Sequence, residues 1–364
     1  MQIFEYPSKI SQQILALGPE SNGNFSIFKK GKIYFSEDFG DLLVDANFNR
    51  FKKELNLFLK KEQIKPDVIL TDLHPLYKAT LLGEKLGKKF KAQHIQIQHH
   101  IAHIYSQIFN LQIPNSFFGI ALDGTGYGLD GKIWGGEVFK MSNKIPIERV
   151  GHLEDQVMIG GDLAIQEPAR MLLSILAKFL SKKEVYARVK KYYSQQEFEV
   201  LYNQLQQNFN CVETSSTGRI LDAVSLLLGF CTNERNYKHE PIELLEKNSN
   251  KPYLNLKPVI LNNILMTTPL FEYLIKNIHK DKKRLAATAQ LYIAQGLDEI
   301  IKLQTKFHPP QIFLSGGIAN NKIISEYFTS KKNKAGIPSG TPAVQIPRGD
   351  AGVSFGQIVY YLSF

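Results

Sequence analysis

The feature that most constrains the fold of this chain is the order in which apolar patterns follow one another. Three runs rich in β-forming residues, at 13–17, 25–28 and 32–36, precede a segment with helical spacing of apolar residues. Strand-like and helix-like patterns then alternate up to residue 110. The first third therefore predicts the order βββαβαβα.

The same order returns further along the chain. Three strand patterns fall between residues 117 and 152, helical patterns rich in Lys and Tyr fill about 182–280, and the alternation resumes toward the C-terminus. Two βββαβαβα units are the layout of the actin, hexokinase and Hsp70 superfamily, which binds nucleotide between its lobes. We expect an α/β protein with a first lobe at 1–115, a second lobe at 116–364, and a helical insertion in the second lobe.

Length and composition agree with two folded lobes. The 364 residues include 43% hydrophobic and 21% charged residues, which suits a chain that buries a core in each of two lobes. The N-terminus lacks an apolar signal core and no stretch approaches ~20 apolar residues, so we expect a cytoplasmic protein without membrane contact. The net charge of +10 is spread among acidic residues, which argues against nucleic acid as a partner.

Two cysteines, Cys211 and Cys231, lack the spacing of a zinc motif, whereas two histidines have a spacing that suits a metal. His99 and His103 follow a predicted strand and are four residues apart. On a helix both imidazoles would lie on one face and could share a metal ion, with a third ligand from elsewhere. The alternative is that these histidines only begin and cap a helix.

A glycine-rich segment, DGTGYGLDG at 123–131, lies between the first two strands of the second unit. Glycines let a backbone approach a phosphate closely, consecutive N–H groups form an anion-binding nest, and Thr125 adds a hydroxyl donor. The alternative is a hairpin turn without a ligand. The position of this segment in an actin-like fold favours phosphate.

Two further segments stand at strand-to-helix junctions. LSGGIANN at 314–321 would present backbone and a helix N-terminus to a ligand, although the same pattern occurs as plain packing. Asp350, in PRGDAG, follows a predicted strand at 343–347, where the carboxyl ends of strands meet ligands in open α/β sheets. Asp350 could instead be a simple N-cap.

Several motifs occur together in one order: TDLHPLY, QHHIAH, LDGTGYGLDGKIWGGE, GGDLAIQEPARM, SSTGRILDAV, LSGGIANN and GDAGVSFGQ. In this combination the chain resembles the C-terminal catalytic module of HypF-type carbamoyltransferases, which serve [NiFe]-hydrogenase maturation. The resemblance covers nearly the whole chain. That module is similar to the threonylcarbamoyl-transferring protein of tRNA modification.

The resemblance implies a metal (Zn, Fe or Mg) held by His99, His103 and Asp350, and an adenine nucleotide (carbamoyl-adenylate, ATP or AMP). Arg170 is implied as a fourth catalytic residue that holds a phosphate or carbonyl oxygen, with a salt bridge on a helix surface as the alternative. The residues implied to surround the nucleotide are Asp123, Gly124, Thr125, Gly126, Gly161, Asp162, Asp222, Ser315, Gly316, Gly317 and Asn321.

The implied reaction passes a carbamoyl group from carbamoyl-adenylate to the C-terminal cysteine thiol of a HypE-like protein, for cyanide-ligand synthesis. The family pattern has an activating part ahead of this module, so we expect a separate protein to form the adenylate. Two segments depart from the family pattern: 18–24 lacks a usual Lys-Asn pair, and 237–240 (YKHE) replaces an acid, Gly and Gln. Both departures leave the acceptor open. Alternatives are an O-carbamoyltransferase of a small molecule, and a tRNA-modification or nucleotide-binding regulatory protein.

Overall fold

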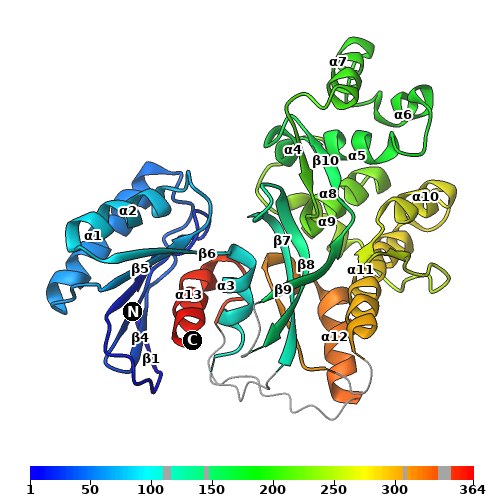
Figure 1. The fold of residues 1–364 in the computed structure, drawn as a ribbon. Coiled ribbons are helices and arrows are strands. Elements are labelled where there is room, and N and C mark those ends of the chain that lie inside the picture. The colour runs from blue at the N-terminus through cyan, green and yellow to red at the C-terminus, as the bar shows by residue number, and fades with distance from the viewer. Residues whose placement is uncertain (110–115, 143–146, 306–309, 335–345) are drawn as a thin grey trace.

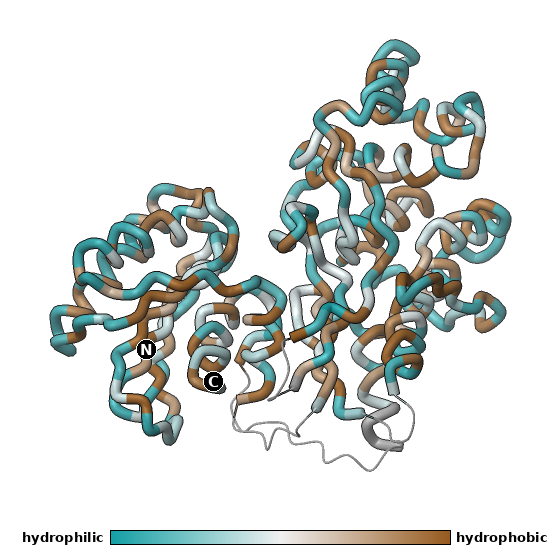
Figure 2. The backbone as a smooth tube through the Cα atoms, in the orientation of Figure 1, coloured by the Kyte–Doolittle hydropathy of each residue, from teal (hydrophilic) through white to brown (hydrophobic). Residues whose placement is uncertain are grey.

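The computed structural model describes residues 1–109, 116–142, 147–305, 310–334 and 346–364. The described chain forms two mixed β-sheets, each with helices packed against it (Figure 1). Strand residues in both lobes are largely hydrophobic, while many outward helix surfaces are polar (Figure 2). The expected α/β fold with two lobes is confirmed.

The first sheet has the strand order β1-β4-β3-β2-β5-β6. Its central strand, β2, pairs antiparallel with β3 on one side and parallel with β5 on the other. Five buried residues in β5, VILTD, match a strand covered on both faces. The strands are β1 (Gln2–Glu5), β2 (Ile14–Ala16), β3 (Ser26–Lys29), β4 (Lys32–Phe35), β5 (Val68–Asp72) and β6 (Gln93–Ile97).

The second sheet repeats this arrangement around β7. Strand β7 pairs antiparallel with β8 and parallel with β14, as β2 does with β3 and β5. The predicted duplication is therefore visible in the pairing of the strands. The strands are β7 (Ser116–Tyr127), β8 (Ile133–Ser142), β9 (Glu148–Leu153), β10 (Gln156–Ile159), β11 (Cys211–Thr214), β12 (Ile260–Leu261), β13 (Ile264–Leu265) and β14 (Ile312–Ser315).

Helices follow the strands in the order that the apolar spacing predicts. On α1, Phe51, Leu55 and Leu59 recur at four-residue intervals and are buried against one face of the first sheet. The helices are α1 (Asp45–Lys61), α2 (Lys78–Phe90), α3 (His99–Ser106), α4 (Leu163–Gln166), α5 (Pro168–Leu176), α6 (Lys182–Val189), α7 (Gln195–Gln206), α8 (Thr217–Leu228), α9 (Glu240–Lys247), α10 (Thr268–Lys276), α11 (Lys282–Gln304), α12 (Lys322–Lys334) and α13 (Val353–Leu362), with short 3₁₀ helices η1 (Gly317–Asn320) and η2 (Asp350–Gly352).

Two helices, α3 and the C-terminal α13, lie side by side between the sheets (Figure 1). Helix α13 covers the face of the first sheet that is opposite α1, where Phe355 packs with Phe4 and Phe35. Gly356 allows the close contact between the helices, because a Cβ atom there would clash with the carbonyl oxygen of Ala102 on α3. The end of the chain is thus part of the structure that holds α3 in place.

The structure differs from the sequence predictions in three places. Strand β1 was not predicted, and the insertion at 182–280 contains β11, β12 and β13 in addition to helices. The glycine-rich segment was expected to be a turn, but β7 continues through it to Tyr127, with a shift of register between Leu122 and Gly126.

Two sequence predictions fall on residues that the structure does not describe. The strand expected at 343–347 lies largely there, and so does the expected lobe boundary near 115. The division into lobes at that residue stays a prediction. Within the described ranges, every helix is too short or too polar to cross a membrane.

Candidate metal and nucleotide site

Helix α3 presents two imidazoles to one point. It begins directly after β6, and the Gln98 side chain caps it by accepting a hydrogen bond from the backbone N–H of Ile101. His99 and His103 are one helical turn apart, and their Nε2 atoms lie 3.0 Å from each other. Both side chains are buried. The spacing seen in the sequence therefore yields a pair of nitrogen ligands that face the same point.

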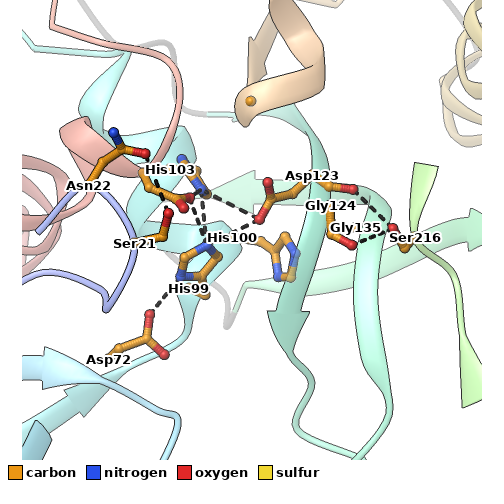
Figure 3. Close-up of polar contacts among 12 residues, drawn as sticks. Ser21, Asn22, Asp72, His99, His100, His103, Asp123, Gly124, Gly135 and Ser216 are labelled. Atoms are coloured by element: carbon orange, nitrogen blue, oxygen red, sulfur yellow. Dashed lines mark hydrogen bonds and ion pairs between the residues drawn. The ribbon is translucent and has the colours of Figure 1, made fainter. Parts of the chain in front are cut away.

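Two carboxylates from the second lobe complete the cluster, and Figure 3 shows one of them, Asp123, directed at the two imidazoles. Asp123 on β7 places Oδ2 at 3.2 Å from Nε2 of His99 and at 3.9 Å from Nε2 of His103. Asp350, the first residue of η2, places Oδ1 at 3.6 and 3.4 Å from the same two nitrogens. All four donor atoms lie within 4.8 Å of one another. We call these four residues the ligand cluster.

Asp72, the last residue of β5, holds His99 from behind. Its Oδ2 lies 2.6 Å from Nδ1 of His99, which directs the opposite nitrogen, Nε2, into the ligand cluster. Strands β5 and β6 are parallel neighbours and Asp72 pairs with Ile97, so their carboxyl ends bring Asp72 beside the start of α3. Asp72 was not among the site residues predicted from the sequence. Its position at the carboxyl end of a strand was the available signal.

The charges of the cluster are strongly coupled. Burial opposes protonation of His99, but the neighbouring carboxylates, Asp72 first among them, outweigh it and hold the pKa of His99 well above its usual value. Burial likewise opposes ionisation of Asp350, but the two imidazoles and Lys238 hold its pKa well below the usual value. The pKa of Asp123 is lowered too, because the imidazoles outweigh burial and the repulsion from Asp350.

His100 is buried on the same helix but does not belong to the cluster. Its Nδ1 lies 2.9 Å from the Gln98 amide, and a Cβ atom at Gly126 would clash with its ring. Burial, reinforced by the charge of His99, places the pKa of His100 well below its usual value, so the ring is neutral. Gly126 therefore serves the packing of β7 on this imidazole.

The donor set fits a metal ion. Two ligands that are each about 2.1 Å from one ion lie roughly 3–4 Å apart, and the distances between the two Nε2 atoms and from these atoms to the carboxylate oxygens fall in this range. The two imidazole Nε2 atoms and an oxygen from each of the two carboxylates converge on one point, as the ligands of a metal ion do. Asp123, which the sequence analysis assigned to the nucleotide, is a fourth candidate ligand.

Glycines leave the backbone open beside the cluster. A Cβ atom at Gly317 would meet Asp123 Oδ1 only at 3.7 Å, and one at Gly124 would meet Arg219 at 3.9 Å. Gly316 is different: it has φ of +95° and lies so close to β7 that a side chain would clash with Leu122. Gly124 and Gly317 are thus positions where a ligand can approach backbone, while Gly316 serves the fold.

The N-terminus of α8 packs directly on the bulge of β7. Ser216 caps α8 and also donates to the carbonyl oxygen of Gly124 at 2.6 Å. One turn later, Asp222 accepts from two buried arginines, Arg219 at 2.8 Å and Arg235 at 2.7 Å. The Asp222 carboxylate is therefore paired within an internal ion network beside the site.

The other predicted residues are more scattered. Arg170 pairs with Glu167 within α5 at 3.0 Å, which is the salt-bridge alternative. Asn321 donates to Gln290 on α11 at 2.7 Å and so joins helices. Asp162 is exposed at the start of α4, close enough to His74 to influence its charge. None of these described contacts reaches the ligand cluster.

Three predicted nucleotide residues remain. Gly161 has φ of +57° in the turn after β10, Thr125 is half-buried on the bulge of β7, and Ser315 is buried at the end of β14. Of these, Thr125 and Ser315 lie on the two neighbouring strands that lead to the ligand cluster.

Comparisons with known proteins identify the family of the chain. Residues 119–357 match the family described as carbamoyltransferase, Kae1-like domain, second subdomain, and residues 9–110 match the HypF Kae1-like domain. The chain belongs to the HypF carbamoyltransferase family. It is 41% identical over 362 residues to a probable carbamoyltransferase HypF of Methanocaldococcus jannaschii, covering 97% of this chain and 46% of that protein.

Other relatives and solved structures are similar to this chain over nearly its whole length. A carbamoyltransferase HypF of Synechocystis sp. is 26% identical, over 97% of this chain and 48% of its own length. The crystal structure of T. kodakarensis HypF superposes with a TM-score of 0.88 at 32% identity, covering 99% of this chain and 48% of that one. The crystal structure of full-length HypF in a phosphate- and nucleotide-bound form superposes with a TM-score of 0.87 at 25% identity, covering 99% of this chain and 57% of that one. The chain spans about half the length of these HypF proteins.

Proposed function

We propose that this chain is a carbamoyltransferase module that passes a carbamoyl group from carbamoyl-adenylate to an acceptor. The observation that carries the proposal is the ligand cluster, which lies beside the open backbone of Gly124 and Gly317 in a chain of the HypF family. A metal and an adenylate phosphate would then be neighbours at the junction of the two lobes. The solved HypF with bound phosphate and nucleotide supports this use of the fold.

The donor set favours iron or zinc over magnesium. Imidazole nitrogens suit Zn and Fe, whereas Mg²⁺ prefers oxygen ligands and keeps several waters. In the proposed site His99, His103, Asp123 and Asp350 would hold the ion, and Asp72 would orient His99. The bound ion would supply Lewis acidity toward the carbamoyl carbonyl oxygen.

The residues of the chain bind and orient the two reactants. The backbone of the β7 bulge and the N-terminus of α8, packed on it through Ser216, would face the adenylate phosphate. In the transfer, the acceptor sulfur forms a bond to the carbamoyl carbon while the bond from that carbon to the phosphate oxygen breaks. AMP leaves with the electron pair, and the thiol proton passes to solvent.

The proposed acceptor is the C-terminal cysteine of a HypE-like protein, in the synthesis of cyanide ligands for [NiFe]-hydrogenase. A hydroxyl acceptor is the second candidate, because of His239. Burial, together with the charge of Lys238, lowers the pKa of His239, so the imidazole is neutral at pH 7 and can accept a hydroxyl proton.

A reconstituted transfer assay tests the proposal. The metal-loaded chain is incubated with a carbamoyl-adenylate-forming protein, ATP, carbamoyl phosphate and a HypE-like acceptor, and the acceptor is weighed by mass spectrometry. We expect one carbamoyl group on the C-terminal cysteine, and none with Asp350→Ala. An unmodified cysteine with an active adenylate-forming protein would refute the thiol acceptor, and carbamoylation of an alcohol that depends on His239 would favour the second candidate.

A further inference from the structure

The two segments that depart from the family pattern meet in space at the ligand cluster. Lys238, in the 237–240 segment of the second lobe, donates a hydrogen bond through Nζ to Oγ of Ser21, in the 18–24 segment of the first lobe. The same Nζ lies 3.5 Å from Oδ2 of Asp350. Figure 3 shows Ser21 and Asn22 close to His103 and His99. One lysine therefore reaches across the lobe junction to a candidate metal ligand.

The backbone of Lys238 is held by buried groups, whereas its side chain is exposed. Arg235 donates through NH1 to the carbonyl oxygen of Lys238 at 2.7 Å, and through NH2 to Asp222 at 2.7 Å. The side chains of Arg235 and Asp222 are only 4% and 1% exposed, whereas that of Lys238 is 54% exposed. A buried ion network thus fixes the backbone position from which a half-exposed cation extends to the site.

Stability of the fold does not explain this arrangement. Exposed ion pairs contribute about 0–1 kcal/mol, because solvent screens the attraction and a long side chain loses freedom. Asp350 already has His99 and His103 as partners, so the carboxylate does not need Lys238 for its own hydrogen bonding. The lysine is therefore free to exchange its present contacts for a ligand.

The negative charges around the cluster would repel an entering anion unless a cation lies on the side where the anion enters. Asp72, Asp123 and Asp350 together carry three negative charges within this group, one more than a divalent metal ion would neutralise. An adenylate phosphate that approaches them meets repulsion unless positive groups receive it. A lysine ammonium binds phosphate as a point charge, with three donors on a flexible stem.

We propose that Lys238 is a phosphate-binding residue of this module. When the adenylate binds, the Lys238 ammonium gives up its contacts with Asp350 and Ser21 and binds the phosphate, first of the adenylate and then of the departing AMP. The inference rests on the proposed function. The sequence at 237–240, which differs from the family pattern, would then serve to recognise the AMP leaving group. This role does not depend on which acceptor takes the carbamoyl group. Lys238 would thereby connect the two lobes through the bound nucleotide.

Calorimetric titration of the metal-loaded chain with AMP and with adenosine tests the assignment. Lys238→Met keeps the length and apolar character of the stem but removes the charge. We expect AMP binding to weaken about tenfold, the effect of losing one charge-assisted hydrogen bond, with adenosine binding unchanged. Lys238→Arg should restore most of the AMP affinity. Lys32→Met is the matched control, because Lys32 is also half-exposed and paired, with Glu5 at 3.2 Å.

The outcomes separate the inference from the proposed function. If wild type binds AMP and Lys238→Met binds it equally well, Lys238 does not bind the phosphate, and the proposed function stands. An equal loss of affinity for AMP and for adenosine would also overturn the inference, since Lys238 would then affect the arrangement of the two lobes and would not bind the phosphate. If wild type binds neither compound, both proposals fail. A melting temperature for each variant shows that the chain remains folded.

Discussion

Two buried polar groups, the ligand cluster where the lobes meet and the surroundings of Glu137 in the second lobe, differ in how their atoms are paired. In the ligand cluster, imidazole nitrogens and carboxylate oxygens from both lobes face one another around a common point. Around Glu137 on β8, every partner is complementary: the carboxylate accepts from Arg149 Nε at 2.5 Å, from Ser215, and from the N–H groups of Gly135 and Gly136 at 3.2 Å. Arg149 also stacks on Trp134 at 4.0 Å.

The difference separates a binding group from a structural one. Glu137 is fully buried, and its charge is neutralised by protein donors, so nothing further is needed to stabilise it. The ligand cluster brings two imidazole nitrogens and two carboxylate oxygens to one point, which is a set of donor atoms that a metal ion can bind. Substitutions in the two groups should therefore affect different measurements: metal content in one group, stability in the other.

Loss of a cluster imidazole should have the largest effect. We expect His103→Ala to reduce metal from about one ion per chain to background, because removal of a direct ligand costs more than the ~100-fold typical of an outer partner. Metal analysis of the purified protein measures this. His94→Ala is the control, because His94 lies on β6 near α3 but bonds Thr71 at 2.8 Å outside the cluster. Equal metal in His103→Ala and wild type would contradict the ligand assignment.

Neutralising Glu137 should have the next largest effect, and on stability. Glu137→Gln removes the buried charge that faces Arg149 Nε and leaves Arg149 with the more distant Asp130 carboxylate at 3.7 Å, and breaking a buried pair in this way costs about 3 kcal/mol. Urea unfolding should show the loss, while the folded variant should bind metal with unchanged stoichiometry. A variant that keeps its stability but loses metal would remove the distinction between the two groups.

Much of the fold could be predicted because hydrophobic periodicity reports burial directly. Strands β2 to β6 and α1 follow from local patterns, and the duplication follows from their repetition. Strands β11 to β13 were missed because they lie between segments with helical patterns and gain their order from pairing with other strands. The glycine-rich part of β7 was expected to be a turn because glycine favours turns locally, whereas pairing with β8 decides the outcome.

The site was predictable where spacing along one helix defines it. His99 and His103 needed only the i, i+4 rule, and the family motif added Asp350. Asp72 and Asp123 come from other strands, and only the sheet topology brings them to α3. Sequence distance likewise concealed the contact of Lys238 with Ser21, because it joins residues of different lobes.

Neutralising Asp72 should have a smaller effect on metal than loss of a direct ligand. Asp72→Asn keeps a partner near Nδ1 of His99 but removes the charge that orients the ring, so we expect metal affinity to fall about 10- to 100-fold. Competition with a chelator measures the affinity. Asp67→Asn is the control, since Asp67 stands just before the other end of β5 and accepts from the Gln13 backbone at 2.8 Å. If both variants hold metal like wild type, Asp72 does not support the site.

The smallest effect should come from a second self-satisfied carboxylate, Glu154. It accepts from Lys178 at 2.8 Å and from the backbone N–H groups of Thr267 and Thr268 at the start of α10. Burial opposes its ionisation, but these donors, Lys178 first, outweigh burial and lower its pKa. Glu154→Gln should cost about 1 kcal/mol at pH 7, comparable to loss of a helix cap, with metal content unchanged.

The pH dependence of this last variant follows from the direction of its pKa shift. A carboxyl group whose pKa is lower in the folded state stabilises the fold above its unfolded pKa of about 4.3, and this contribution disappears as the pH falls through the folded value. The difference in unfolding free energy between wild type and Glu154→Gln should therefore be constant near pH 7 and narrow below about pH 4. Glu54→Gln, at an exposed position on α1, should show no such change. A gap that widens in acid would mean that the partners of Glu154 do not hold it as a carboxylate, and would contradict its assignment as a self-satisfied group like Glu137.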